Sequence, residues 1–191
     1  MGLGQRFVIT GGIASGKTMV VDLLSGAGWS VIKADVVGHQ VLTDPGVVDA
    51  VTAKWPAVAV NGEVSRSELA RVVFASPDHL SALEAITQPL IVDRIDRWME
   101  STVGLLAVEV PVLKVTRTRW GPVVVAYAPL ILRRERALAR GMAPADVDAR
   151  LAVQPSDSGL LAAADFVIDN HGTIGDLELA VRRFDAWARS T

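Results

Sequence analysis

Short apolar runs rich in β-branched residues alternate along the chain with longer segments of helical periodicity. Continuous apolar runs of this length are typical of parallel strands, because helices cover both faces of such sheets. The first helix is expected at residues 16–25, before the turn at Gly26-Ala27-Gly28. The pattern therefore predicts an α/β fold with a parallel five-stranded sheet, whose strands lie at residues 6–10, 30–34, 105–110, 123–126 and 166–168.

Two helical segments are too long to be simple connections in such a fold. Residues 36–104 lie between the second and third strands, and turn signals divide them at Asp44-Pro45-Gly46, Asn61-Gly62 and Ser76-Pro77-Asp78. We interpret this segment as a helical insertion that binds an acceptor substrate. Residues 130–163, which contain several arginines, are interpreted as a lid region. The 191 residues are expected to form a single domain, 1–191, with these two additions.

A phosphate-binding loop, or P-loop, is predicted between the first strand and the first helix. The pattern of Gly, four residues, then Gly-Lys-Ser/Thr is matched by Gly11-Gly12-Ile13-Ala14-Ser15-Gly16-Lys17-Thr18. Glycines let the backbone wrap a phosphate with its N–H groups directed inward, and the next helix directs its N-terminal dipole at the anion. The alternative is a chance match, which the flanking strand and amphipathic helix disfavour.

The motif assigns a role to each of its polar side chains. Lys17 is expected to reach the β- and γ-phosphates of ATP, and the Thr18 hydroxyl is expected to ligate Mg²⁺. We therefore predict that the cofactor ATP, with Mg²⁺ held by Thr18, binds to Gly12, Ile13, Ala14, Ser15, Gly16, Lys17, Thr18 and Met19.

From this loop onward the chain resembles the dephospho-CoA kinases over nearly its whole length. The resemblance implies a three-layer P-loop kinase that uses ATP to phosphorylate the ribose 3′-hydroxyl of dephospho-CoA, the last step of coenzyme A synthesis. The landmarks that carry it are Thr10-Gly11-Gly12-Ile13, Ala34-Asp35, Arg66, Leu83-Glu84-Ala85-Ile86, Pro89-Leu90-Ile91, Val110-Pro111, Arg136, Arg140-Gly141, Arg150, Gln154 and Ala164-Asp165-Phe166-Val167-Ile168-Asp169-Asn170.

The resemblance implies roles for residues outside the loop. Asp35 would be the general base, or the carboxylate that orients the 3′-hydroxyl; the alternative is a helix N-cap. Arg136 and Arg140 lie one helical turn apart and would neutralise the transferred phosphoryl group, although arginines on a helix can also form an ordinary solvated face. Asn170 falls where family members contact adenine, and its alternative is a simple turn. Arg66 and Pro89 would bind the substrate.

Several positions depart from the usual pattern of the family. Lys33 stands where the family usually has aspartate, and Arg133 where it usually has glutamine. If Lys33 and Asp35 shared one face of a strand, about 6–7 Å apart, the ammonium would make Asp35 a weaker base. These departures leave two alternatives open: a kinase for another nucleotide or small hydroxyl acceptor, and a nucleotide-binding protein without turnover.

Composition limits the remaining classes of function. The chain has no cysteine, which excludes disulfides, thiolate metal sites and thiol nucleophiles. Its formal net charge of −2 gives no indication of a nucleic-acid or membrane partner, and its apolar runs are too short to span a bilayer. We therefore expect a cytoplasmic enzyme that acts on a small-molecule substrate. The sequence predicts no oligomeric state.

Overall fold

The computed structural model describes residues 4–111 and 120–191, and the chain divides into two compact units. One unit contains the described residues up to Lys33 and those from Met99 onward. The other unit is Ala34–Trp98.

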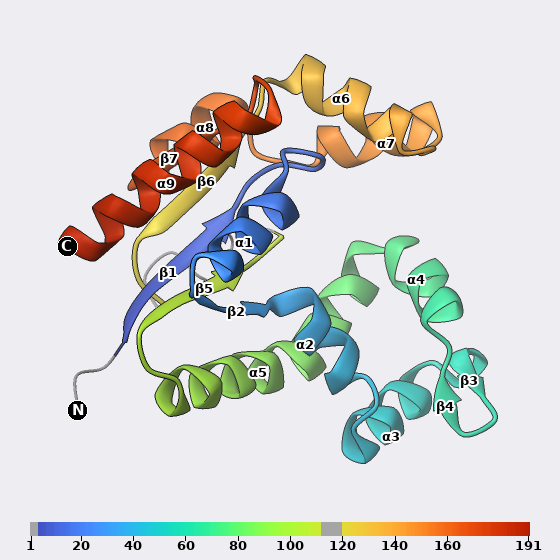
Figure 1. The fold of residues 1–191 in the computed structure, drawn as a ribbon. Helices are drawn as coiled ribbons and strands as arrows, with labels where there is room; N and C mark the ends of the chain where they lie inside the picture. Colours follow the sequence, from blue (N-terminus) through green and yellow to red (C-terminus); the bar gives the residue numbers. More distant parts are fainter. Residues whose placement is uncertain (1–3, 112–119) are drawn as a thin grey trace. The chain divides into compact units, whose positions relative to one another are not determined.

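The first unit is built on a parallel sheet of five strands in the order β2-β5-β1-β6-β7 (Figure 1). This confirms the predicted sheet, and every strand boundary agrees with the prediction to within one residue. After β1 the chain adds strands β2 and β5 toward one edge of the sheet, and later strands β6 and β7 toward the other edge. The order of the strands therefore reverses at β1, and in open α/β sheets ligands bind at the carboxyl end of the strand where this happens. The strands are β1 (Gln5–Thr10), β2 (Ser30–Lys33), β5 (Leu105–Glu109), β6 (Val123–Tyr127) and β7 (Phe166–Asp169).

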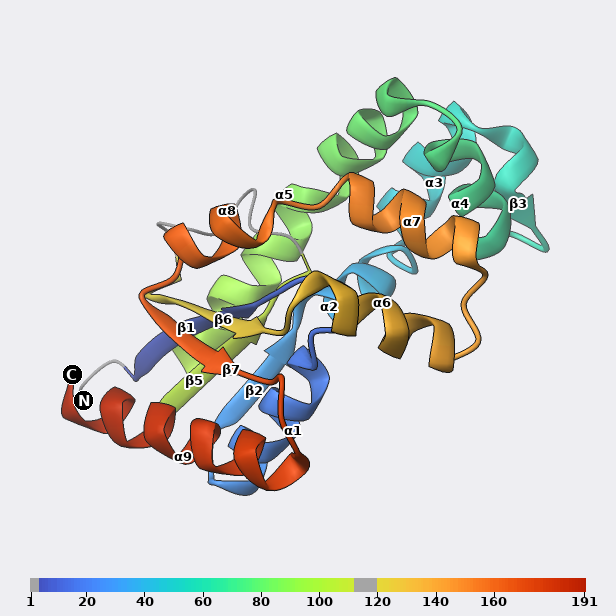
Figure 2. The ribbon, with the colours of Figure 1, turned by 90° about the horizontal axis from the view of Figure 1, so that it is seen from above.

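Helices pack on both faces of this sheet. Helices α1 (Lys17–Gly26) and α9 (Ile174–Ser190) lie side by side on one face, and α8 (Asp157–Ala162) packs near β6 on the other (Figure 2). Strand β6 shows the consequence for the sequence pattern. Val124 is buried with the α1–α9 core, whereas Val123 and Val125 are buried with Leu160 of α8. Both faces of the strand are apolar, which explains its continuous apolar run.

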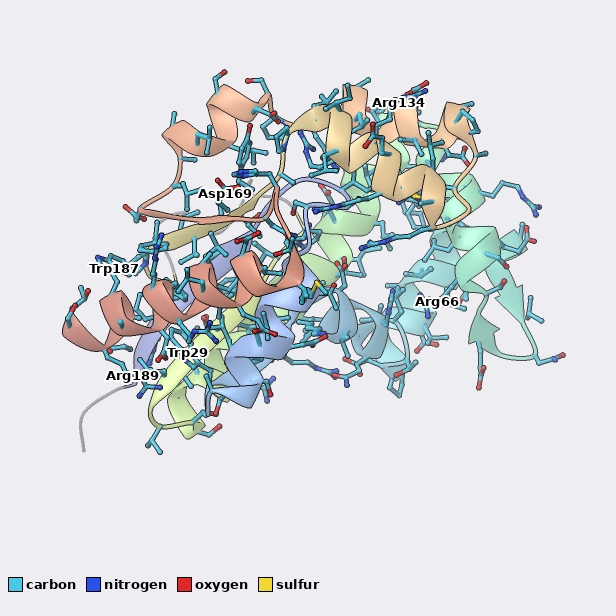
Figure 3. All side chains as sticks on the ribbon, turned by 45° about the horizontal axis from the view of Figure 1, so that its top comes forward. Trp29, Arg66, Arg134, Asp169, Trp187 and Arg189 are labelled. Carbon is cyan, nitrogen blue, oxygen red and sulfur yellow. The ribbon has the colours of Figure 1, made fainter. Side chains whose placement is uncertain are left out.

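An aromatic cluster fixes α9 to the sheet. Its neighbouring ring centroids are 5.2–6.0 Å apart. The Trp29 indole Nε1 donates a hydrogen bond of 2.6 Å to Asp185 on α9, so the one polar atom of this ring is satisfied. Trp29 is labelled in Figure 3. The cluster therefore anchors the C-terminal helix beside β1. Its members are Phe7, Trp29, Phe166, Phe184 and Trp187.

The second unit is mainly helical. Helix α3 begins at Pro45 and α5 at Pro77, where the sequence predicted breaks. The third break, Asn61-Gly62, is the turn of a two-stranded antiparallel hairpin that the sequence did not predict. The elements are α2 (Ala34–Val41), α3 (Pro45–Lys54), a 3₁₀ turn (Pro56–Val58), β3 (Ala59–Val60), β4 (Glu63–Val64), α4 (Arg66–Phe74) and most of α5 (Pro77–Ser101).

Two further helices of the first unit follow β6. They are α6 (Leu130–Ala139) and α7 (Pro144–Ala152), and they precede α8 in the segment interpreted as a lid. Within residues 4–111 and 120–191, no helix is both long and apolar enough to cross a membrane.

Candidate active site

The predicted phosphate-binding loop connects the central strand β1 to helix α1. Gly11, Ala14 and Gly16 have positive φ angles of 154°, 56° and 97°. A Cβ atom on Gly11 would lie 2.3 Å from the carbonyl oxygen of Ala126, and one on Gly16 would lie 2.0 Å from Asn170 Nδ2. The two end glycines of the motif are therefore required both by backbone conformation and by close contacts.

The N-terminus of α1 is open to an anion. Its N-cap residue, Gly16, offers no side-chain acceptor, and the first turn of the helix contains no acidic residue. Helix α9 differs, since Thr173 and Asp176 form a capping box at its N-terminus. The α1 amides and the helix dipole are thus available to bind phosphate.

Polar side chains of the loop fit a nucleotide phosphate and Mg²⁺. Lys17 Nζ donates to the carbonyl oxygens of Gly11 (2.8 Å) and Gly12 (3.1 Å), which holds the ammonium against the loop. Thr18, the second residue of α1, is exposed. In the described part of the chain, the buried Ser15 Oγ has no hydrogen-bond partner. A hydroxyl at the start of α1 and an ammonium against the loop suit a metal-bound triphosphate.

A cavity of about 360 Å³ lies beside the loop. It is lined by Gly16 of the loop, Met19 of α1, and Arg136 and Arg140 at the end of α6. Asn170, which follows β7, lines it as well. The structure therefore brings together the loop, both predicted lid arginines and the predicted adenine-binding residue.

Asn170 also supports the loop directly. Its side chain is 6% exposed, and Nδ2 donates a 2.8 Å hydrogen bond to the carbonyl oxygen of Ser15. Its own carbonyl oxygen accepts a 2.9 Å hydrogen bond from Arg136 Nη1. One residue thus connects the loop, the cavity wall and α6.

A sequence model of the dephospho-CoA kinase family matches residues 7–176. The chain belongs to the dephospho-CoA kinase family. A dephospho-CoA kinase from Frankia casuarinae is 37% identical, covering 91% of this chain and 79% of the relative. One from Aromatoleum aromaticum is 35% identical, covering 93% of this chain and 91% of the relative. These findings confirm the family resemblance and the class of an ATP-dependent phosphotransferase.

Solved structures agree with the P-loop kinase fold. A crystal structure of a Thermus thermophilus protein superimposes with a TM-score of 0.87 at 29% identity, covering 97% of this chain and 98% of that one. The dephospho-CoA kinase from Campylobacter jejuni has a TM-score of 0.66 at 22% identity and covers 98% of both chains. A shikimate kinase from Acinetobacter baumannii shares the fold with a TM-score of 0.53 at 13% identity, covering 99% of this chain and 96% of that one.

The residues predicted to bind the acceptor lie in the second unit. Asp35 is the exposed second residue of α2, and Arg66 is the first residue of α4. Arg66 Nη2 lies 2.8 Å from His39 Nε2, so α2 and α4 present a polar pair. Pro89 lies inside helix α5. The roles of Asp35, Arg66 and Pro89 in binding the acceptor remain predictions.

The expectation for Lys33 and Asp35 is wrong. Strand β2 ends at Lys33, and the chain turns directly into helix α2, so the two residues do not alternate along one strand. Lys33 Nζ instead forms an ion pair of 3.3 Å with Asp22 on α1. The N-cap alternative for Asp35 is wrong as well, because the helix already begins at Ala34.

A buried polar network that the sequence did not predict lies next to the loop. Its centre is Arg133 of α6, which is 2% exposed and pairs with Asp157. Gln154 connects Arg133 to the backbone of the loop. Burial, followed by the negative charge of Asp157, raises the pKa of the Tyr127 phenol, so this group remains a donor toward Asp157. The one available signal in the sequence is that Arg133 stands where the family usually has glutamine.

We predict that Gly16→Ala weakens nucleotide binding. An L-residue at this positive φ costs about 1–2 kcal/mol, and its Cβ would displace the Asn170 amide, so we expect the affinity for ADP-Mg²⁺ to fall about 10-fold or more. Isothermal titration would measure it. The matched control is Gly26→Ala at the other end of α1, where an added Cβ meets nothing within 4 Å and binding should not change. Equal affinities for both variants would contradict the assignment of the loop.

Proposed function

We propose that this chain transfers the γ-phosphoryl group of ATP to the ribose 3′-hydroxyl of dephospho-CoA in the cytoplasm, using Mg²⁺. Membership of the family supports the reaction. The observation that supports the site is that residues of the P-loop line one cavity together with Arg136, Arg140 and Asn170.

The nucleotide half of the reaction relies on positioning and charge neutralisation. The α1 amides would hold the phosphates, and Lys17 would exchange the carbonyl oxygens of Gly11 and Gly12 for phosphate oxygens. Thr18 would hold Mg²⁺, which neutralises charge on the β- and γ-phosphates when bound. The lid arginines, Arg136 and Arg140, would neutralise the phosphoryl group during transfer.

The acceptor half is assigned to the second unit. Asp35 would accept the proton of the 3′-hydroxyl or orient it, which is worth about 10²- to 10⁴-fold in rate. Arg66 would bind an anionic part of the acceptor, because a guanidinium suits phosphate groups. Pro89, in the middle of α5, would contribute to the surface that receives the acceptor.

The acceptor can be tested with a matched pair of substrates. We expect the enzyme to release ADP from ATP at least about 100-fold faster with dephospho-CoA than with coenzyme A, because only dephospho-CoA has a free 3′-hydroxyl. A coupled assay of ADP release gives both rates, and amide hydrogen exchange should show protection by dephospho-CoA within Ala34–Trp98. ADP binding without turnover on dephospho-CoA would refute this acceptor. Turnover on other hydroxyl compounds would then identify a different kinase.

A further inference from the structure

Arg133 is the most deeply buried charged side chain near the loop, and it differs from its neighbour on the same helix. The Arg133 side chain is 2% exposed, whereas that of Arg134 is 41% exposed and pairs with Asp148. Arg134 is labelled in Figure 3. Burial of a guanidinium is costly unless its N–H groups find acceptors. The position of Arg133 therefore depends on what it contacts.

Each nitrogen of the Arg133 guanidinium has an acceptor. Nε donates to the Ala128 carbonyl oxygen at 2.9 Å, and Nη2 donates to Asp157 Oδ1 at 2.5 Å. Nη1 donates to Gln154 Oε1 at 3.3 Å. Because Asp157 neutralises the guanidinium, Arg133 is suited to position other groups and not to bind phosphate as an additional cation. The arginines that line the cavity are Arg136 and Arg140.

Gln154 connects Arg133 to the loop. Its Oε1 also accepts a 2.9 Å hydrogen bond from the backbone N–H of Ile13. A glutamine amide can present either its oxygen or its NH₂ group, but two donors converge here on a single atom. Because a guanidinium can only donate, Arg133 fixes the amide with its oxygen toward Ile13.

The same guanidinium contacts the preceding loop residue. Gly12 has no strained φ angle, so its conformation does not require glycine. A Cβ on Gly12 would, however, lie 2.1 Å from Arg133 Nη1 and 2.8 Å from Cζ. The side chain of Arg133 thus packs directly on the loop backbone.

We infer that Arg133 and Gln154 form a positioning pair that sets the conformation of the phosphate-binding loop at Gly12 and Ile13. Asn170 supports the loop at Ser15, so the pair provides the support at the preceding end. When the loop is already ordered before the nucleotide arrives, the loop loses less conformational entropy on binding. The pair therefore strengthens nucleotide binding. This inference rests on the proposed function only in that the loop binds the phosphates of ATP.

Two substitutions remove the pair in different ways. Gln154→Leu keeps the size of the side chain and the Arg133–Asp157 ion pair but removes the acceptor for Ile13. Arg133→Gln introduces the residue that the family usually has. For each, we expect the Kd for ADP-Mg²⁺ and the KM for ATP to rise about 5- to 15-fold, with kcat within about 3-fold of the original. Arg134→Gln, the control on the same helix, should change neither constant.

A double-mutant cycle tests whether the two residues act together. If Arg133 acts through Gln154, the double variant should bind ADP no more weakly than whichever single variant has the lower affinity for ADP. Gly12→Ala adds a second cycle, because it should weaken ADP binding less in Arg133→Gln than in the original protein, where the guanidinium blocks the Cβ. Isothermal titration and thermal unfolding of each variant provide the measurements.

The outcomes separate this inference from the proposed function. Normal ADP binding by folded Gln154→Leu would overturn the inference, and so would fully multiplicative effects of the two substitutions. If Arg133→Gln does not fold, Gln154→Leu decides alone, because it leaves the buried ion pair intact. Failure of the proposed function would appear elsewhere, as ADP binding by the unaltered protein without turnover on dephospho-CoA.

Discussion

Replacing Lys17 with alanine is expected to lower the rate of phosphoryl transfer about 10³-fold while the protein remains folded. The ammonium is held against the loop by the carbonyl oxygens of Gly11 and Gly12, where it would meet the β- and γ-phosphates. Charge develops on the bridging oxygen during transfer, and no other cation of the loop can replace the lysine. The coupled assay of ADP release measures the loss.

The matched control is Lys54→Ala. Lys54 ends helix α3 in the second unit, and its ammonium lies over the Trp55 ring, 5.7 Å from the centroid. We expect this variant to keep its turnover within about 2-fold, since Lys54 is exposed and its cation–π contact has a modest energy. The central assignment fails if Lys17→Ala retains most of its activity with an unchanged melting temperature.

The sheet could be predicted from the sequence because its signal is local and strong. Each strand is a short apolar run between turn residues, and β6 shows why, since Val123 and Val124 are buried on opposite faces. The P-loop could be predicted for a related reason: its chemistry is in the backbone, and Gly11 and Gly16 are needed at fixed positions. Such features need little tertiary information.

The hairpin in the second unit shows where sequence patterns become too weak. Its strands, β3 and β4, have two residues each, which is too short for any alternation to appear. Asn61 and Gly62 both have positive φ angles, as a tight hairpin turn requires. Asn61-Gly62 is itself a hairpin signal, but without a readable strand on either side the dipeptide predicts only a break between helices.

The missed site residues depend on contacts between distant parts of the chain. Arg133 lies on α6, where its neighbours in sequence do not reveal that it faces inward toward Gln154 and Asp157. The Lys33 interpretation failed for a different reason, because an apolar run does not show the residue at which a strand gives way to a helix. Lys33 pairs with Asp22 instead.

Replacing Asp35 with asparagine is expected to lower kcat about 10²- to 10⁴-fold without changing the Kd for ADP-Mg²⁺. Asparagine keeps the size of the side chain but cannot accept the proton of the 3′-hydroxyl. Nucleotide affinity should be unaffected, because the loop, the lid arginines and Asn170 all belong to the other unit. Turnover on dephospho-CoA and titration with ADP provide the two constants.

Substitution of Asp78, which has the same place in its helix, separates a structural role of Asp35 from a catalytic one. Asp78 is the second residue of α5, as Asp35 is the second residue of α2, and both are exposed. An acidic residue in the first turn of a helix stabilises the helix dipole by about 0.3–1 kcal/mol, so both asparagine variants should lose similar stability. Only Asp35→Asn should lose turnover. Equal turnover in the two variants would mean that Asp35 serves only its helix, and that another residue acts as the base.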